Sequence, residues 1–218
     1  MQSRIIAFVI GYGFGQIASG YLFGKAKNVD LRKEGSGNIG STNTLRVLGN
    51  FFGVLTLICD ISKTLLAVWL VWLLFRERAG ESIHLLMLYA AFGSVVGHDF
   101  PAVMRFKGGK GIACSLGLVI ACFPQALPLA AVIFLGTVFV TRFVSLGSIL
   151  GVLSIPLQVM LFARLGVLMF YPQADVPEAV AISVLLAVLG ISLHHANIGR
   201  LLSGTENRFA FHHGKGKN

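Results

Sequence analysis

The chain has 218 residues, of which 55% are hydrophobic and only 12% are charged, and its mean hydropathy is +0.78. Soluble domains carry about 25% charged residues, so this composition excludes a soluble globular protein and indicates an integral membrane protein. The net charge of +9 would suit nucleic acid, but the basic residues lie between apolar segments instead of forming one basic face. We therefore expect no nucleic-acid partner.

Apolar segments of helical length follow one another along the chain. They span residues 5–23, 51–75, 83–96, 112–141, 143–163 and 179–193. A β-barrel would show short alternating strands instead, so we predict an all-α polytopic bundle. The first segment lacks a small-residue cleavage site and is interpreted as a span, not a signal peptide. Residues 1–218 are expected to form a single transmembrane domain, with a disordered tail at 210–218.

The fourth segment is too long for one crossing. Its thirty residues would make a helix of about 45 Å, against a hydrocarbon core of about 30 Å. Pro124 and Pro128 lie near its middle, so we predict two short helices joined by a turn at residues 123–128. Two crossings here give seven transmembrane helices in all.

The basic residues orient the predicted bundle. With seven spans, the polar connections at 24–50, 97–111 and 194–218 share one face, and thirteen of the eighteen Lys and Arg residues lie on it: Lys25, Lys27, Arg32, Lys33, Arg46, Arg105, Lys107, Lys110, Arg142, Arg200, Arg208, Lys215 and Lys217. Basic residues concentrate on the cytoplasmic side of membrane proteins. We therefore expect the N-terminus outside and the C-terminus, with the polar segments, facing the cytoplasm.

The first polar segment is GSGNIGSTNTLRVLG, residues 35–49. Its glycines free the backbone, and its hydroxyl and amide side chains supply hydrogen bonds: Ser36, Asn38, Ser41, Thr42 and Asn43. Arg46 follows about one helical turn later and offers a planar fork that suits phosphate. A flexible linker is the alternative, but a linker seldom holds two asparagines and leads directly into an apolar helix.

The second polar segment, residues 97–113, contains the loop KGGKG at 107–111. Glycine amides, lysine charges and a following helix start together favour a bound phosphate. The alternative is a glycine-rich turn with lysines that flank the membrane. The loop resembles a Walker sequence only loosely, because Gly follows Lys110 where Ser or Thr is needed. His98, beside Asp99, is interpreted as a structural histidine.

The third polar segment, residues 193–209, places His194 and Asn197 three positions apart, so on a helix they face the same way. Arg200 lies one turn further, and Glu206 follows a SGT break. A histidine at a membrane boundary is the alternative interpretation of His194. The nearby Asn197 on the same face favours a functional site.

Charged and polar groups also occur close to or within the spans. Asp60 and Lys63 lie at i and i+3 and are predicted to pair on the face directed into the bundle, with a relay role as the alternative. Arg142 heads the turn between the fifth and sixth spans. Ser145 is expected to face the same polar cavity.

No metal site is expected. Cys59, Cys114 and Cys122 all lie in apolar runs without the spacing of metal ligands, which favours buried structural thiols. The His212–His213 pair in the tail is too short to define a site.

At these residues the chain resembles the bacterial membrane glycerol-3-phosphate acyltransferases that use acyl phosphate. The first segment is similar to the family pattern G-S-G-N-x-G-A-T-N-x-x-R-x-L-G, with Ser41 in place of alanine, and the second is similar to G-H-x-F-P-x-x-x-x-F-K-G-G-K-G-x-A. The third, from His194 to Glu206, resembles R-H-x-x-N-I-x-R-L-x-x-G-x-E. Two positions depart from the family: Leu193 replaces the arginine before the histidine, and Thr64 replaces the glycine that commonly follows the intramembrane lysine.

The resemblance implies seven transmembrane helices in the bacterial cytoplasmic (inner) membrane, a site facing the cytoplasm, and no metal, nucleotide or other cofactor. It implies transfer of an acyl group from acyl phosphate to the 1-position of glycerol 3-phosphate, giving lysophosphatidic acid and phosphate. Membrane lipid and the enzyme that makes acyl phosphate are the other partners expected. The implied catalytic residues are Ser36, Arg46, Lys110, His194 and Asn197. The implied substrate-binding residues are Asn38, Asn43, Lys107, Gly108, Gly109, Gly111, Arg142, Ser145, Arg200 and Glu206.

The chemistry fits this resemblance. Two phosphorylated substrates need fixed cations, and a mixed anhydride is already activated, so positioning and charge stabilisation suffice. No histidine begins the H-x-x-x-x-D pattern of the soluble-type glycerolipid acyltransferases. We therefore expect direct attack by the glycerol hydroxyl. A transporter of phosphorylated metabolites is the alternative, although its polar groups would lie near the bilayer midplane rather than on one face.

Overall fold

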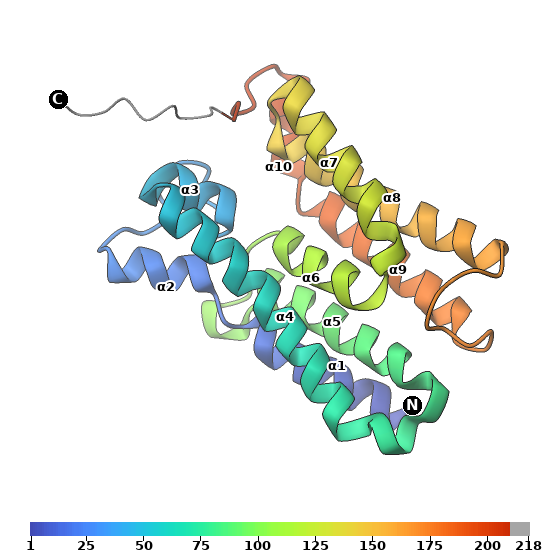
Figure 1. Ribbon diagram of the computed structural model, residues 1–218. Helices are drawn as coiled ribbons and strands as arrows, with labels where there is room; N and C mark the ends of the chain where they lie inside the picture. Colours follow the sequence, from blue (N-terminus) through green and yellow to red (C-terminus); the bar gives the residue numbers. More distant parts are fainter. Residues whose placement is uncertain (210–218) are drawn as a thin grey trace.

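The computed structural model describes residues 1–209, so the tail predicted to be disordered lies outside the described residues. Within this range the chain is all-helical, which confirms the predicted fold class (Figure 1). The α-helices are α1 (Gln2–Gly15), α2 (Ser19–Ala26), α3 (Ser41–Leu48), α4 (Asn50–Ala79), α5 (Ile83–Asp99), α6 (Ile112–Cys122), α7 (Leu127–Thr141), α8 (Val144–Arg164), α9 (Val176–Ser192) and α10 (His195–Leu202). Three 3-10 turns connect some of them: η1 (Gly80–Ser82), η2 (Ala102–Met104) and η3 (Pro124–Ala126).

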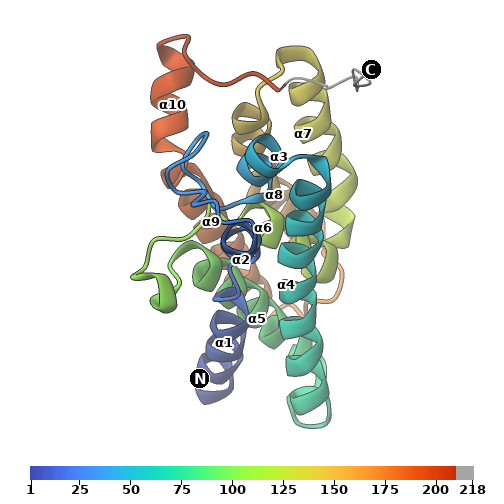
Figure 2. The same cartoon turned by 90° about the vertical axis from the view of Figure 1, so that its left-hand side faces the viewer.

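The helices pack in two groups that share one core. The first group is α1, α4, α5 and α6, and the second is α7, α8 and α9, with α5 against α9 and α6 against α8 joining them. Buried side chains such as Leu88, Leu118, Phe123 and Leu186 fill the space between the groups. In both views α3 and α10 lie toward the upper end of the molecule, away from the N-terminus (Figures 1 and 2).

Several helices are long and apolar enough to cross a membrane. Four stretches meet this criterion among the described residues: Gln2–Ala26, Asn50–Met104, Pro124–Thr141 and Val144–Arg164. The α9–α10 pair forms a fifth if it is counted as one span bent by 55°. Helix α6 has only 11 residues, about 17 Å of rise, which is shorter than the hydrocarbon core. A polytopic helical membrane protein is therefore supported, whereas the number of crossings stays a prediction.

The division of the fourth apolar segment is confirmed. Helix α6 ends at Cys122, η3 covers Pro124–Ala126, and α7 begins at Leu127. Each proline stands in the first turn of its helix, where its missing N–H breaks no internal hydrogen bond. The prolines thus act as helix starts after the break.

The first apolar segment contains a break that its sequence did not reveal. Helix α1 ends at Gly15 and α2 begins at Ser19. A Cβ on Gly15 would lie 2.3 Å from the Ser94 carbonyl oxygen, so α1 touches the α5 backbone directly at this point. The Ile17 carbonyl in the break accepts a hydrogen bond of 2.8 Å from Lys63 Nζ. A distant side chain therefore satisfies a carbonyl that the helix leaves open.

Candidate active site

The second and third polar segments meet through side chains. The Lys110 ammonium, at the end of the KGGKG loop, contacts the side-chain oxygen of Asn197 in α10. The Asn197 amide nitrogen donates to one Glu206 oxygen at 2.8 Å, and Arg200 Nε donates to the other at 2.7 Å. These four side chains, Lys110, Asn197, Arg200 and Glu206, form a connected set that we call the cation cluster.

His194 stands at the N-cap of α10, beside the cation cluster. Its Nδ1 lies 2.7 Å from the Gly190 carbonyl oxygen. A carbonyl only accepts, so Nδ1 carries a proton, and burial lowers the pKa of His194, which favours the neutral ring with its lone pair on Nε2. His194 and Asn197 are both buried, whereas His195 is exposed. The site thus offers a neutral imidazole nitrogen able to accept a hydrogen bond from a hydroxyl group.

The charged groups of the cation cluster have pKa values that differ from those of exposed groups. Burial, together with the nearby Arg200 guanidinium, lowers the pKa of Lys110 to about 8, although Glu206 acts in the opposite direction. Burial alone would raise the pKa of Glu206, but hydrogen bonds from Asn197 and Arg200 outweigh it and hold that pKa below its ordinary value. Glu206 is therefore an anion, and its hydrogen bonds hold the side chains of Asn197 and Arg200 in place.

The turn between α7 and α8 adds Ser145 to this region. Ser145 lies buried in the first turn of α8, and its hydroxyl has no hydrogen bond of ordinary geometry. It is nevertheless close enough to the Glu206 carboxylate to help lower the pKa of that group. Arg142 caps α7 in a left-handed conformation, with φ of 65°, and its carbonyl accepts from the Phe209 amide at 2.7 Å. The chain after α10 is thereby fastened to this turn.

Asn43 organises the first polar segment. Its side-chain nitrogen lies within hydrogen-bonding distance of three carbonyls, of Leu31, Glu34 and Asn38, and its oxygen accepts from the Ser36 amide at 2.8 Å. Its side chain is only 2% exposed, so its polar atoms are already used inside the loop. The structure therefore places Asn43, expected as a substrate ligand, in a loop-shaping position. Asn38 has a similar local contact, from the Gly40 amide to its Oδ1.

Ser36 and Arg46 remain available to a ligand. Both are exposed, Ser36 in the loop before α3 and Arg46 in the last turn of α3. Neither is joined to the cation cluster by a hydrogen bond or ion pair among residues 1–209. The structure thus brings together the second and third segments directly, with the first segment at the same end of the molecule (Figure 2).

The KGGKG loop differs from the expected cradle of free amides. The Gly108 amide donates to the Asp99 carbonyl at 3.1 Å, and the Gly109 amide donates to the His98 carbonyl at 3.0 Å. A Cβ on either glycine would lie 2.1 Å from an atom of His98. The amides of Gly108 and Gly109 are therefore committed to the end of α5, and both residues are small because the loop touches that helix. The side chains of Lys107 and Lys110 give the loop its positive charge.

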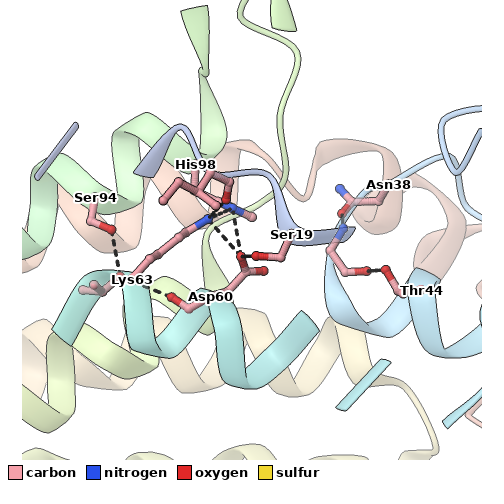
Figure 3. A network of polar contacts seen from close by, with 10 residues as sticks. Ser19, Asn38, Thr44, Asp60, Lys63, Ser94 and His98 are labelled. Carbon is pink, nitrogen blue, oxygen red and sulfur yellow. Dashed lines mark hydrogen bonds and ion pairs between the residues drawn. The ribbon is translucent and has the colours of Figure 1, made fainter. Parts of the chain in front are cut away.

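A buried network lies beneath this loop and was only partly predicted (Figure 3). The Asp60–Lys63 ion pair is confirmed, with Nζ 2.9 Å from Oδ1 and both residues buried. Lys63 Nζ also lies 2.8 Å from His98 Nδ1, and Ser19 Oγ donates to Asp60 at 3.1 Å. Sequence reasoning missed these two links because 35 and 41 residues, respectively, separate the partners.

One group of potential metal ligands occurs within the described part of the chain. Ligand atoms of Asp60, His98 and Cys114 lie within 4.8 Å of one another. The Lys63 ammonium is hydrogen-bonded to the first two, so a cation already stands between them. Of the three cysteines, all free, Cys114 and Cys122 are buried and Cys59 is partly buried.

The hydrogen bonds of the histidine rings show whether a histidine activates a serine or cysteine nucleophile. In residues 1–209, the hydrogen-bond partners of histidine rings are Lys63, the Gly190 carbonyl and the Ser192 carbonyl. No serine or cysteine in this range is thus activated by a histidine in the manner of a catalytic triad.

Comparison with known proteins places the chain among membrane acyltransferases. A family model described as glycerol-3-phosphate acyltransferase matches residues 5–204. A glycerol-3-phosphate acyltransferase of Trichlorobacter lovleyi is 40% identical over 198 residues, covering 91% of this chain and 93% of that protein. A glycerol-3-phosphate acyltransferase of Halalkalibacterium halodurans is 40% identical over 202 residues, covering 92% of this chain and 93% of that protein.

Crystal structures of PlsY (YgiH), an integral membrane glycerol 3-phosphate acyltransferase, are similar in fold. Its glycerol 3-phosphate form has a TM-score of 0.79 at 32% identity and covers 95% of this chain and 96% of that chain. Its lysophosphatidic acid form has a TM-score of 0.77 at 31% identity with the same coverage.

Proposed function

The chain belongs to the glycerol-3-phosphate acyltransferase family and is a multi-pass membrane enzyme, and from this premise we propose that its acyl donor is an acyl phosphate and its product 1-acyl-glycerol 3-phosphate. The family assignment also decides against the transporter that the sequence alone left open. Membrane lipid surrounds the apolar outer faces of the helices, such as that of α7 with exposed Leu129, Val132 and Leu135.

The cation cluster carries this proposal. Lys110 and Arg200 are linked through Asn197 and the Glu206 carboxylate, and His194 stands at the N-cap of the helix that carries Asn197 and Arg200. Lys107 and Arg46 add exposed cations at the same end of the chain's fold. Two phosphorylated substrates repel each other unless fixed cations offset their charge. A site with several cations suits an acyl phosphate and glycerol 3-phosphate bound together.

The transfer is a direct displacement. The C1 hydroxyl oxygen of glycerol 3-phosphate attacks the acyl carbonyl carbon, forming the ester bond. The bond from that carbon to the phosphate oxygen breaks, and the phosphate leaves with the electron pair. The hydroxyl proton passes to the leaving phosphate, with His194 Nε2 as the alternative acceptor that the geometry also supports. Phosphate departs as inorganic phosphate, so no covalent acyl-protein is formed.

A donor comparison tests the proposal. Purified protein in detergent would be given labelled glycerol 3-phosphate with acyl phosphate, acyl-CoA or acyl-carrier protein of the same chain length. We expect labelled lysophosphatidic acid, with one phosphate released per product, from acyl phosphate only. Equal product from a thioester donor would contradict the assignment of the donor. No product from any donor would contradict the acyltransferase itself.

The proposed topology has seven crossings, formed by α1, α4, α5, α6, α7, α8 and α9, in the bacterial cytoplasmic membrane. The excess of basic residues supports a cytoplasmic position for α3, the KGGKG loop and α10. A single cysteine in place of Gln125, within η3, should react with an impermeant reagent from outside the membrane. A cysteine in place of Leu202, which is 85% exposed at the end of α10, should react only after the membrane is opened. The reverse pattern would contradict this topology.

An acyl phosphate is a reactive mixed anhydride, which hydrolyses if it is released into water. A site at the membrane surface can receive it directly from the enzyme that makes it. We include this functional coupling in the proposal. Product formation from a coupled system should resist a soluble hydrolase of acyl phosphates, and complete loss of product on adding that hydrolase would contradict the coupling.

A further inference from the structure

We propose that Lys63 is a positioning residue that holds the first and second polar segments relative to each other. Its ammonium belongs to the buried network of Figure 3. The effect on catalysis rests on the proposed function, since these two segments supply Arg46 and Lys110. The structural claim, that one buried ammonium fixes both loops, does not depend on the identity of the substrates.

Lys63 joins three separate parts of the chain. Its Nζ donates to the Ile17 carbonyl at 2.8 Å, to Asp60 Oδ1 at 2.9 Å and to His98 Nδ1 at 2.8 Å. An ammonium has three hydrogens and accepts none, so all its donors are used and His98 Nδ1 is the acceptor. Lys63 is 3% exposed and Asp60 is 1% exposed. The geometry of the three parts is therefore set by one saturated, buried group.

One branch leads to the second polar segment. Because His98 Nδ1 accepts from Lys63, its proton lies on Nε2, which faces Gly109 so closely that a Cβ there would be 2.1 Å away. The Gly109 amide also donates to the His98 carbonyl. Fixing the His98 ring therefore fixes the loop that ends in Lys110.

The other branch leads to the first polar segment. Lys63 holds the Ile17 carbonyl in the α1–α2 break, and Asp60 accepts from Ser19 Oγ at the start of α2. Gly20, the next residue, faces the first segment: a Cβ on it would lie 2.0 Å from the Ile39 carbonyl oxygen and 2.8 Å from Thr44 Oγ1. The start of α2 therefore supports the loop that precedes α3 and Arg46.

Stability alone does not account for this ion pair. A buried pair loses its hydration, and apolar residues of similar volume are often as stabilising or more so. In the bilayer this cost favours apolar replacements further. An apolar cluster would lack directional hydrogen bonds. The ion pair makes such bonds to the α1–α2 break and to His98, and these bonds position the first and second polar segments.

The test uses a double variant, because removing Lys63 alone would leave Asp60 as an unpaired buried charge. Asp60→Asn with Lys63→Met removes both charges at similar volume and keeps an acceptor for Ser19. The control is Thr64→Val, which removes the neighbouring 2.9 Å hydrogen bond between Thr64 and Ser94 across the same α4–α5 contact. Amide hydrogen exchange, followed by mass spectrometry without substrate, reports the Gly108, Gly109, Ser36 and Gly40 amides.

We expect exchange in peptides covering 36–44 and 107–111 to be at least tenfold faster in the double variant, with α7 and α8 unchanged. In the Thr64→Val control, both segments should exchange as in the wild type. The kcat/KM for glycerol 3-phosphate should fall at least tenfold in the double variant and less than twofold in the control. Unchanged exchange in the two segments, faster exchange spread over all helices, or an equal effect of Thr64→Val would each overturn the proposal. An inactive wild type with the expected exchange pattern would contradict the proposed function alone.

Discussion

The Lys110 ammonium contacts the side-chain oxygen of Asn197, although 87 residues separate them in the chain. This contact joins the end of the KGGKG loop to α10, and Asn197 in turn holds Glu206. Two segments that look like separate polar loops in the sequence therefore form one site. The activity of the enzyme should accordingly depend on side chains from both.

Lys110→Ala should reduce kcat/KM for acyl transfer at least a hundredfold, because it removes a desolvated cation from the phosphate site. The thermal stability of the variant in detergent should stay close to wild type, since the side-chain contact of Lys110 is a polar one, to Asn197. The assay is formation of lysophosphatidic acid, with Lys33→Ala, an exposed lysine, as control. Nearly full activity in Lys110→Ala would show that the loop is only a turn.

The activity should fall on the alkaline side as Lys110 loses its proton. The pKa of Lys110 is about 8, so the ammonium is present below that pH and becomes a neutral amine above it. The kcat/KM, which reports the free enzyme, should therefore decline through about pH 8. The substrate phosphate titrates near pH 6 and is already a dianion there.

Lys110→Arg supplies the matched comparison, because a guanidinium stays charged throughout this range. Its kcat/KM, although lower than wild type, should be flat between pH 7.5 and 9.5 (roughly the window around the lysine titration). An alkaline decline that persists unchanged in Lys110→Arg would assign the titration to another group.

Arg46→Lys should also be damaging, since a planar fork is replaced by a point charge. Each charged hydrogen bond contributes roughly 1.5–3 kcal/mol, so the loss should be about tenfold to hundredfold in kcat/KM. Arg76→Lys is the control: Arg76 lies over the Trp72 ring in the last turn of α4, and this variant should stay within about twofold of wild type. Wild-type kinetics in Arg46→Lys would remove Arg46 from the phosphate site.

Gly109→Ala tests the contact between the loop and α5. The added methyl would lie 2.1 Å from His98 Nε2, so either the loop or the ring must move. We expect at least a tenfold loss of kcat/KM with a folded protein. Gly136→Ala, where a Cβ meets nothing within 4 Å, should be neutral in activity. Equal activity of the two variants would mean that loop placement does not govern catalysis.

Much of the fold could be predicted from hydropathy and from helix-breaking residues. The two prolines correctly predicted a helix break within residues 112–141, and the i, i+3 spacing of Asp60 and Lys63 correctly predicted their pairing. The spacing of His194 and Asn197 predicted that they face the same way, and the structure buries both of them. These features are local, so a short stretch of sequence determines them.

The remaining features depend on which groups of the protein each polar atom meets in the folded chain. The α1–α2 break carries no proline, and its open carbonyl is satisfied by Lys63, 46 residues away. The amides of Gly108 and Gly109 were expected to be free, but α5 carbonyls accept from both. Asn43 was expected to bind substrate, but its side chain is used by its own loop. Residue type alone does not distinguish a donor that faces a ligand from one that faces the protein.

The most direct test of direct acyl transfer is a single-turnover experiment with acyl phosphate labelled in its acyl group. Enzyme in excess of donor would be mixed rapidly in detergent, with and without glycerol 3-phosphate, and quenched in acid at successive times. We predict that the label passes from acyl phosphate to lysophosphatidic acid at the rate of donor loss, with no label on the protein at any time. Label that appears on the protein and then passes to lysophosphatidic acid when glycerol 3-phosphate is added would contradict the account.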